Sequence, residues 1–175
     1  MSRGFVKEDD QEEPPFIPPR APLPDGVLNY VTPRGLRLLH AERNAMEQAI
    51  SDALGNAALA DYDRRRAVAE LEGRLALLHE RIVTARVVEP GDAIPPEVRF
   101  GCTVQFRHLN GPQQGTARSF TIVGVDEADV KEGRIAFTAP IARALMGKRA
   151  GELIELRLGA APQQLELLAI TLQSD

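Results

Sequence analysis

The chain is short of cysteine, tryptophan and long apolar runs, and these shortages exclude several classes of protein. Its single cysteine, Cys102, cannot form an internal disulfide or a cysteine metal cluster, and it suits a reducing cytosol. No apolar run approaches the roughly 18 residues of a membrane-spanning helix. The N-terminus also lacks the basic-then-apolar pattern of a secretory signal. We therefore expect a cytoplasmic protein that does not act at a membrane.

Net basic charge and clustered metal ligands are also missing. The formal net charge is −4, so no bulk attraction to nucleic acid is expected. The histidines stand far apart, at positions 40, 79 and 108, and we expect neither a metal site nor a cofactor. Three acids gather at Asp126, Glu127 and Asp129, a pattern that predicts a turn with solvated carboxylates rather than a metal site.

Two long amphipathic helices are predicted between residue 32 and about residue 86. In each, apolar residues follow an alternating three-four spacing, which is typical of the seam of a coiled coil. The seam residues are Leu36, Leu39, Met46, Ile50 and Ala53 in the first helix, and Val68, Leu71, Leu75, Leu78, Ile82 and Ala85 in the second. The other faces are densely charged, which favours solvated helices over a hairpin packed on its own domain.

The ends of these helices carry capping signals. Thr32 suits the N-cap of the first helix, and Pro33 suits its first turn. Gly55 suits a left-handed residue that ends this helix, and Asn56 suits the N-cap of the next. So short a connection makes the helices antiparallel. At about 1.5 Å per residue, the predicted finger is roughly 33 Å long.

The tip of this finger is its most informative part, because a finger carries its tip where a globular body cannot enter. The tip residues are Gly55, Asn56, Ala57, Ala58 and Leu59, with the acids Asp61 and Asp63 only nearby. A basic run, Arg64, Arg65 and Arg66, follows on the second helix. This run is either a contact to an anionic partner or a solvated face.

Residues 1–30 form a Pro-rich acidic tail. Six prolines fall between Pro14 and Pro24, after a run of acids over residues 8–13. Proline prevents a helix interior or a central strand, so we expect this segment to be extended or disordered. A mobile tether is the expected role, although the apolar residues Phe5, Val6, Phe16 and Ile17 leave docking on a partner open.

After a linker at 89–97, residues 98–175 show the pattern of a small α+β domain. Short alternating segments predict strands at 103–107, 119–123, 135–138, 153–158 and 165–172. Asn110-Gly111-Pro112 marks a hairpin loop, and residues 140–146 predict one or two helical turns. We expect a small antiparallel sheet, with Cys102 as a buried structural thiol at the start of its first strand.

Several segments resemble the bacterial GreA/GreB transcription elongation factors. Four in the C-terminal half carry the resemblance: FGCTV at 100–104, IVGVDEAD at 122–129, APIARALMGK at 139–148 and GELIEL at 151–156. Thr32-Pro-Arg-Gly-Leu and Glu72-Gly-Arg match parts of the family's helical domain. The resemblance implies an antiparallel coiled coil, here residues 31–88, followed by an FKBP-like domain at 98–175.

The resemblance also implies a partner, bacterial RNA polymerase. In the family, the C-terminal domain binds the rim of the secondary channel, and the coiled coil enters the pore. The rim contact maps here onto Phe137, Thr138, Ala139, Pro140 and Ile141. For the arginine run, a contact with phosphate of the nascent RNA or with the pore wall stands against the alternative of a solvated basic face. Acids at the family's tip help hold a second Mg²⁺ in the polymerase active site, which then cleaves backtracked RNA. We expect a monomer.

The tip departs from this family pattern. Cleavage-proficient tips follow Gly-Asp-Leu-x-Glu-Asn-Ala-Glu-Tyr, whereas residues 55–62 read Gly-Asn-Ala-Ala-Leu-Ala-Asp-Tyr, one residue shorter. Aligned on Gly55, the two catalytic acids become Asn56 and Leu59. Aligned back from Tyr62, they become Gly55 and Ala58. Asp61 alone keeps an acid of the motif.

The main expectation is a channel-binding modulator of elongation that is not an enzyme and has no catalytic residue. One alternative is stimulation of transcript cleavage by Asp61 or Asp63. Another is peptidyl-prolyl isomerisation by the FKBP-like domain, which the absence of tryptophan disfavours. A coiled-coil adaptor without polymerase contact is a further alternative.

Overall fold

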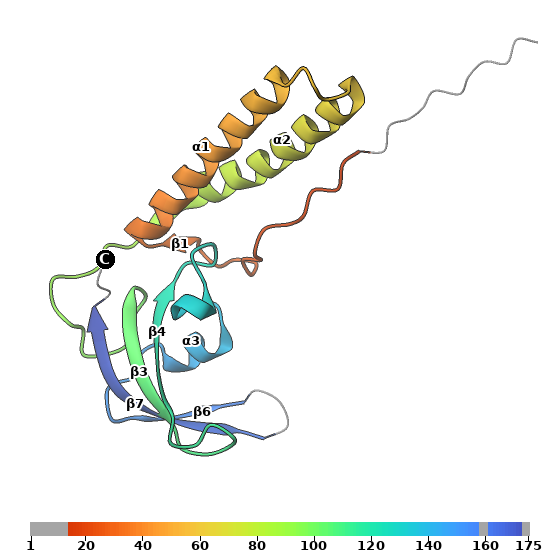
Figure 1. Ribbon diagram of the computed structural model, residues 1–175. Coiled ribbons are helices and arrows are strands. Elements are labelled where there is room, and N and C mark those ends of the chain that lie inside the picture. The colour runs from red at the N-terminus through yellow and green to blue at the C-terminus, as the bar shows by residue number, and fades with distance from the viewer. Residues whose placement is uncertain (1–13, 158–160, 173–175) are drawn as a thin grey trace, which may run out of the picture.

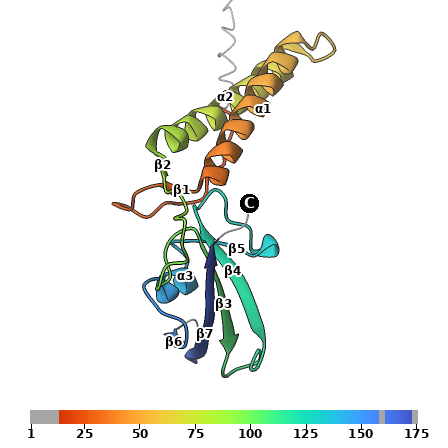
Figure 2. The same cartoon turned by 90° about the vertical axis from the view of Figure 1, so that its left-hand side faces the viewer.

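A computed structural model describes residues 14–157 and 161–172. A long two-helix hairpin projects from one end of a curled β-sheet domain, and Figures 1 and 2 show it from two sides. The predicted α+β class is confirmed. The predictions for Phe5, Val6 and the acids at 8–13 lie outside the described residues.

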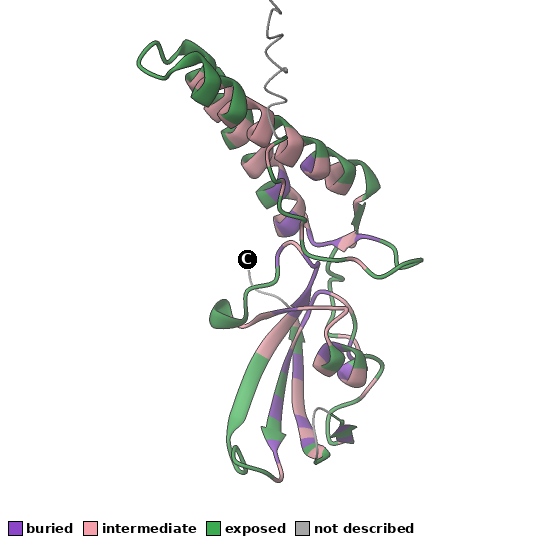
Figure 3. Cartoon of the chain, turned by 90° about the vertical axis from the view of Figure 1, so that its right-hand side faces the viewer, coloured by how far each residue is buried: buried purple, intermediate pink, exposed green. Residues whose placement is uncertain are grey.

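The hairpin consists of α1 (Pro33–Gly55) and α2 (Asp61–Thr84). As predicted, α1 starts after Thr32, whose hydroxyl accepts a hydrogen bond of 2.9 Å from the Gly35 N–H. The apolar seam is best buried near the base, where Leu39 is 2% exposed and Leu78 is 0% exposed. Figure 3 shows the change from buried and half-buried residues at the base to exposed ones at the tip.

The turn at the tip differs from the prediction at both of its signal residues. Gly55 still belongs to α1 and is not among the glycines with a left-handed φ. Asn56 does not cap α2; its side-chain oxygen accepts a hydrogen bond of 3.0 Å from the Ala58 N–H. The N-cap of α2 is Ala60. The connection thus spans residues 56–60, and this local Asx turn lets it reverse direction without a left-handed residue.

A five-stranded sheet forms the second part of the molecule. Its strands are β3 (Cys102–His108), β4 (Ala117–Val123), β5 (Arg134–Ala136), β6 (Leu153–Leu156) and β7 (Gln163–Leu172), in the spatial order β5-β4-β3-β7-β6. The β5–β4 pair is parallel, so the prediction of a wholly antiparallel sheet is wrong at this edge. The connection between these strands contains the short 3₁₀ helix η1 (Val130–Glu132), which carries the chain back for parallel pairing.

The core of this domain lies between the sheet and the short helix α3 (Pro140–Leu145). Phe106, Leu145 and Leu167 are fully buried in it. Cys102 is buried and unpaired, which confirms the predicted structural thiol. A shift in the β3–β7 register between Gln105 and Phe106 bends the sheet around this core.

Two unpredicted features support the hairpin. A parallel pair of two-residue strands, β1 (Tyr30–Val31) and β2 (Arg86–Val87), joins the start of α1 to the end of α2. Residues 14–28, which we call the N-terminal strap, lack regular structure and contact the hairpin (Figure 1). This docking differs from the mobile tether that the composition predicts.

Candidate functional site

The tip of the hairpin presents a neutral and largely apolar surface. Residues 54–63 are all exposed, including the apolar Leu54 at 60% and Tyr62 at 44%. Leu59 lies between them and is 36% exposed. No carboxylate occurs among residues 53–60. The structure therefore brings the predicted tip residues together, but as an apolar cap and not as a cation site.

Two of the acids next to the tip, Asp61 and Asp52, are engaged in local contacts. Asp61, in the first turn of α2, forms an ion pair with Arg64 one turn further along. Asp52 accepts a hydrogen bond of 2.8 Å from the Gln48 side chain. Within the part of the chain that the structure describes, no group of three or more His, Cys, Asp or Glu side chains could hold a metal ion.

The arginine run near the tip does not form one patch. Arg64 is partly buried against Asp61, whereas Arg65 and Arg66 are exposed. Consecutive residues of an α-helix are turned by about 100° from one another, so the three side chains leave α2 in different directions. The run therefore offers separate basic contacts around α2.

Some residues of the predicted rim-binding loop pack against the rest of the protein, and others face solvent. Phe137 packs against Tyr30 and Phe100, with ring centroids 5.8 and 5.6 Å away. Ala139 and Ile141 pack against the domain core.

Of the five predicted loop residues, Pro140 is exposed and the other four are half-buried. Thr138 is not among the residues that pack on the domain core. Arg143 and Met146 extend this accessible surface at α3, and sequence reasoning did not single them out. Their motif, APIARALMGK, was the available signal.

The acidic turn at 126–129 is not solvated as predicted. The Glu127 side chain is 1% exposed, lies 3.1 Å from the Arg34 guanidinium, and accepts a hydrogen bond from the Thr32 hydroxyl. A Cβ at Gly35 would lie 2.7 Å from Glu127 Oε2, so glycine is needed there. The segments 32–36 and 122–129 thus bind each other, a long-range contact that the local pattern of acids does not reveal.

The other two acids of this turn have separate roles. Asp129 accepts a hydrogen bond of 3.0 Å from the Lys131 N–H at the start of η1. The side chain of Asp126 is 6% exposed and lies between two arginines. The prediction of solvated acids is therefore wrong for Asp126 and Glu127, because the base of the hairpin covers them.

Comparisons with known proteins agree with the placement of these segments. The family described as "Transcription elongation factor, GreA/GreB, C-term" matches residues 93–172. GreA of Thermodesulfovibrio yellowstonii is 31% identical over 141 residues, which cover 78% of this chain and 87% of that protein. GreA of Hyphomonas neptunium is 34% identical over 137 residues, covering 76% and 85%.

Among solved structures, elongation factor GreA/GreB from Nitrosomonas europaea aligns with 22% identity and a TM-score of 0.38, over 81% of this chain and 98% of that one. In the described ranges, no helix is both long and apolar enough to cross a membrane. On the identity and coverage of its curated relatives, this chain belongs to the GreA/GreB family of transcription elongation factors.

Proposed function

We propose that this protein binds bacterial RNA polymerase at the secondary channel and modulates elongation without supplying acids for transcript cleavage. In this proposal the hairpin enters the pore as an antiparallel coiled coil, and an FKBP-like sheet domain binds the rim. The observation that carries the proposal is the tip of a Gre-family hairpin with no carboxylate among residues 53–60.

The chemistry of the tip supports this reading. A second Mg²⁺ in a cleavage site needs hard, charged oxygen ligands. The tip offers the neutral amide oxygen of Asn56, which already accepts a hydrogen bond from the Ala58 N–H, and the apolar Leu59. The protein would therefore contribute no catalytic group and need no cofactor of its own. Any Mg²⁺ would belong to the polymerase.

Occupying the pore is then the proposed mode of action. A hairpin of this length with an apolar cap excludes other factors from the same channel. Pro140 and Thr138 on the accessible side of the rim-binding loop would provide the docking contact, together with Arg143. Arg65 and Arg66, which are exposed near the tip, would contact RNA phosphates.

One alternative keeps transcript-cleavage stimulation, with Asp61 or Asp63 as the acid. The exposure of the Asp61 side chain, 78%, favours it. The ion pair with Arg64 opposes it, because a neighbouring guanidinium competes with a cation for the same carboxylate.

The deciding experiment uses a backtracked elongation complex with labelled RNA and Mg²⁺ at neutral pH. We expect no cleavage by this protein alone, and suppression of cleavage when it competes with a cleavage-proficient factor. Co-sedimentation with core polymerase reports binding independently. Cleavage that is lost in Asp61→Ala or Asp63→Ala would overturn the proposal, and absence of binding would favour the adaptor alternative.

A matched variant tests whether the tip chemistry is the reason. Asn56→Asp combined with Leu59→Glu restores two carboxylates at the positions aligned on Gly55. We expect this pair of changes to convert the protein from a competitor into a factor with detectable cleavage, with unchanged binding to polymerase. The same types of change placed lower on the hairpin, Asn44→Asp with Leu38→Glu, serve as the control and should leave cleavage absent.

A further inference from the structure

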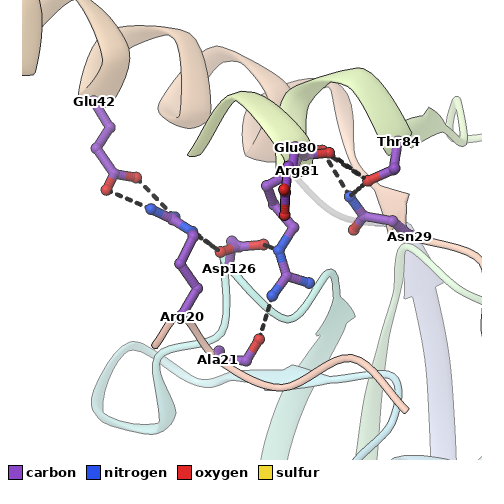
Figure 4. A network of polar contacts seen from close by, with 8 residues as sticks. All are labelled: Arg20, Ala21, Asn29, Glu42, Glu80, Arg81, Thr84 and Asp126. Atoms are coloured by element: carbon purple, nitrogen blue, oxygen red, sulfur yellow. Dashed lines mark hydrogen bonds and ion pairs between the residues drawn. The ribbon is translucent and has the colours of Figure 1, made fainter. Parts of the chain in front are cut away.

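The N-terminal strap crosses the junction between the hairpin and the sheet domain, and Arg20 lies at the crossing (Figure 4). Its guanidinium makes a two-pronged contact with Glu42 on α1, with N–O distances of 2.8 and 2.9 Å. The same group donates from Nε to Asp126 Oδ1 at 3.0 Å. One side chain of the strap therefore binds the hairpin and the sheet domain at the same time.

Asp126 receives a second arginine from the other helix. Arg81 Nε on α2 lies 3.3 Å from Asp126 Oδ2, as an ion pair without hydrogen-bond geometry, and Arg81 also donates to the Ala21 carbonyl of the strap. Figure 4 shows the two guanidiniums approaching Asp126 from opposite sides. With Glu42, this cluster holds two positive and two negative charges, so its formal charges cancel.

The cluster is shielded from solvent, and this burial strengthens its ion pairs. The side chains of Arg20, Arg81 and Asp126 are 18%, 13% and 6% exposed. Ion pairs at such exposure are screened less by salt than surface pairs, and a missing partner leaves an uncompensated charge. The hydrogen bond with Glu42 raises the pKa of Arg20 above its ordinary value in spite of desolvation, so Arg20 keeps its charge at any physiological pH.

An apolar contact fixes the strap further along α2. Ile17 lies over Gly73, where an added Cβ would meet Ile17 Cδ1 at 2.5 Å. Ile17 and Leu23 face Leu77 across a shared groove between the strap and α2. The strap is thus bound at two points, by apolar packing on α2 and by the ionic cluster at the junction.

We propose that residues 14–23 act as a latch that fixes the direction of the hairpin relative to the sheet domain. Glu127 and the packing of Tyr30 against Phe137 already join the start of α1 to the sheet domain, but these contacts all lie near one helix end and allow the hairpin to pivot about it. Arg81 on α2 pairs directly with Asp126, and the latch adds Arg20, which links the same acid to Glu42 on α1. The attachment at Asp126 then engages both helices. The rigid fork of an arginine suits this role because it holds two carboxylates in a defined geometry. This property concerns the chain alone and holds with or without a polymerase partner.

Distances between the two parts test the latch directly. Ser51 on α1 and Ser119 on β4 are both exposed, and substitution by cysteine provides sites for spin labels. Cys102 is buried and need not be replaced. Double electron–electron resonance on the full chain then reports the distribution of the distance between hairpin and sheet.

The variants that test the latch are Arg20→Gln and deletion of residues 1–23. The controls are deletion of residues 1–13 and Arg107→Gln, which breaks an exposed ion pair with Glu166 inside the sheet domain.

We expect a narrow distribution in the intact chain and in both controls, and a broader or shifted one in Arg20→Gln and in the longer deletion. An unchanged distribution in these two variants would overturn the latch.

A second readout needs no variant: trypsin cleavage after Arg20 should be slower in the intact protein than in a peptide of residues 14–29. Equal rates would also overturn the proposal, because the bond cannot be cut while Arg20 is held by Glu42 and Asp126.

Discussion

The two ends of the hairpin differ in how far their side chains are buried and in how distant their contact partners are in the sequence. At the tip, side chains are exposed and the contacts join residues close in sequence, such as Asp61 with Arg64 and Asn56 with Ala58. At the base, side chains are buried and the contacts join residues far apart, such as Thr32 with Glu127. The tip is therefore free to change its chemistry without affecting the fold, whereas the base is constrained by several partners at once.

This difference explains how the residues of the tip can change while the architecture of the hairpin is kept. The motif residues Thr32 and Arg34 bind Glu127, which belongs to another motif of the same resemblance, and a side chain at Gly35 would collide with it. Changing one of them disturbs the others. Asn56 and Leu59 have no such long-range partners among the contacts described for the tip.

The largest expected contrast comes from equal truncations at the two ends. Leu78→Ala at the base removes a side chain that is 0% exposed, and we expect a loss of about 3 kcal/mol in the free energy of unfolding. Leu54→Ala at the tip, where the leucine is 60% exposed, should change it by less than about 0.5 kcal/mol. Urea unfolding followed by circular dichroism measures both. Equal losses would show that the tip is as constrained as the base.

Removing a charge at the base should cost less stability than truncating Leu78, but more than removing a charge from an exposed ion pair. Glu127→Gln keeps the shape of the side chain but removes the charge that faces Arg34, and it should cost about 1.5 kcal/mol. This figure is moderate because the Arg34 side chain is 32% exposed and partly screened. The matched control is Glu166→Gln, whose partner Arg107 is 47% exposed, with an expected cost under about 0.5 kcal/mol. A neutral result for Glu127→Gln in urea unfolding would contradict the constraint at the base.

The sheet domain should make the stability of the protein depend on pH through His108. Burial, and then the charge of Arg118, lowers the pKa of His108 below its ordinary value. A base with a lowered pKa binds protons less readily in the folded state than in the unfolded state. Its contribution is therefore complete at neutral pH and is lost as the pH falls below about 6.5.

Comparing urea unfolding at about pH 7 and about pH 5.5 tests this dependence. His108→Gln should lose less stability on acidification than the unchanged chain. His79→Gln, at an exposed position of α2, should behave like the unchanged chain. The same acid sensitivity in all three proteins would assign the effect to other groups.

The smallest expected effect lies at the tip. Asp61→Ala removes an exposed ion pair and should change the free energy of unfolding by less than about 0.5 kcal/mol. We also expect it to leave polymerase binding unchanged, because the proposed docking surface lies on the sheet domain. Urea unfolding and co-sedimentation with polymerase check the two parts. Weakened binding would mean that the tip itself makes an essential contact.

Much of the architecture follows from local sequence patterns. The apolar spacing predicts both helices, Thr32 predicts the start of α1, and alternation predicts the strands of the sheet. Residues 140–146 similarly predict α3. The neutral tip is also a property of sequence alone, because its residues are consecutive and need no partner to be brought together.

Tertiary structure decided what depends on segments far apart in the chain. The parallel pairing of β5 with β4, the burial of Asp126 and Glu127, and the docking of the Pro-rich strap have no local signature. The local sequence predicts that an acid in a turn is solvated, because it does not show that a helix end covers the acid. It also predicts that an extended Pro-rich segment is mobile, because it does not show that the arginine of this segment binds two carboxylates. Composition sets the backbone preferences of such segments, but burial and charge pairing depend on which distant surface they meet.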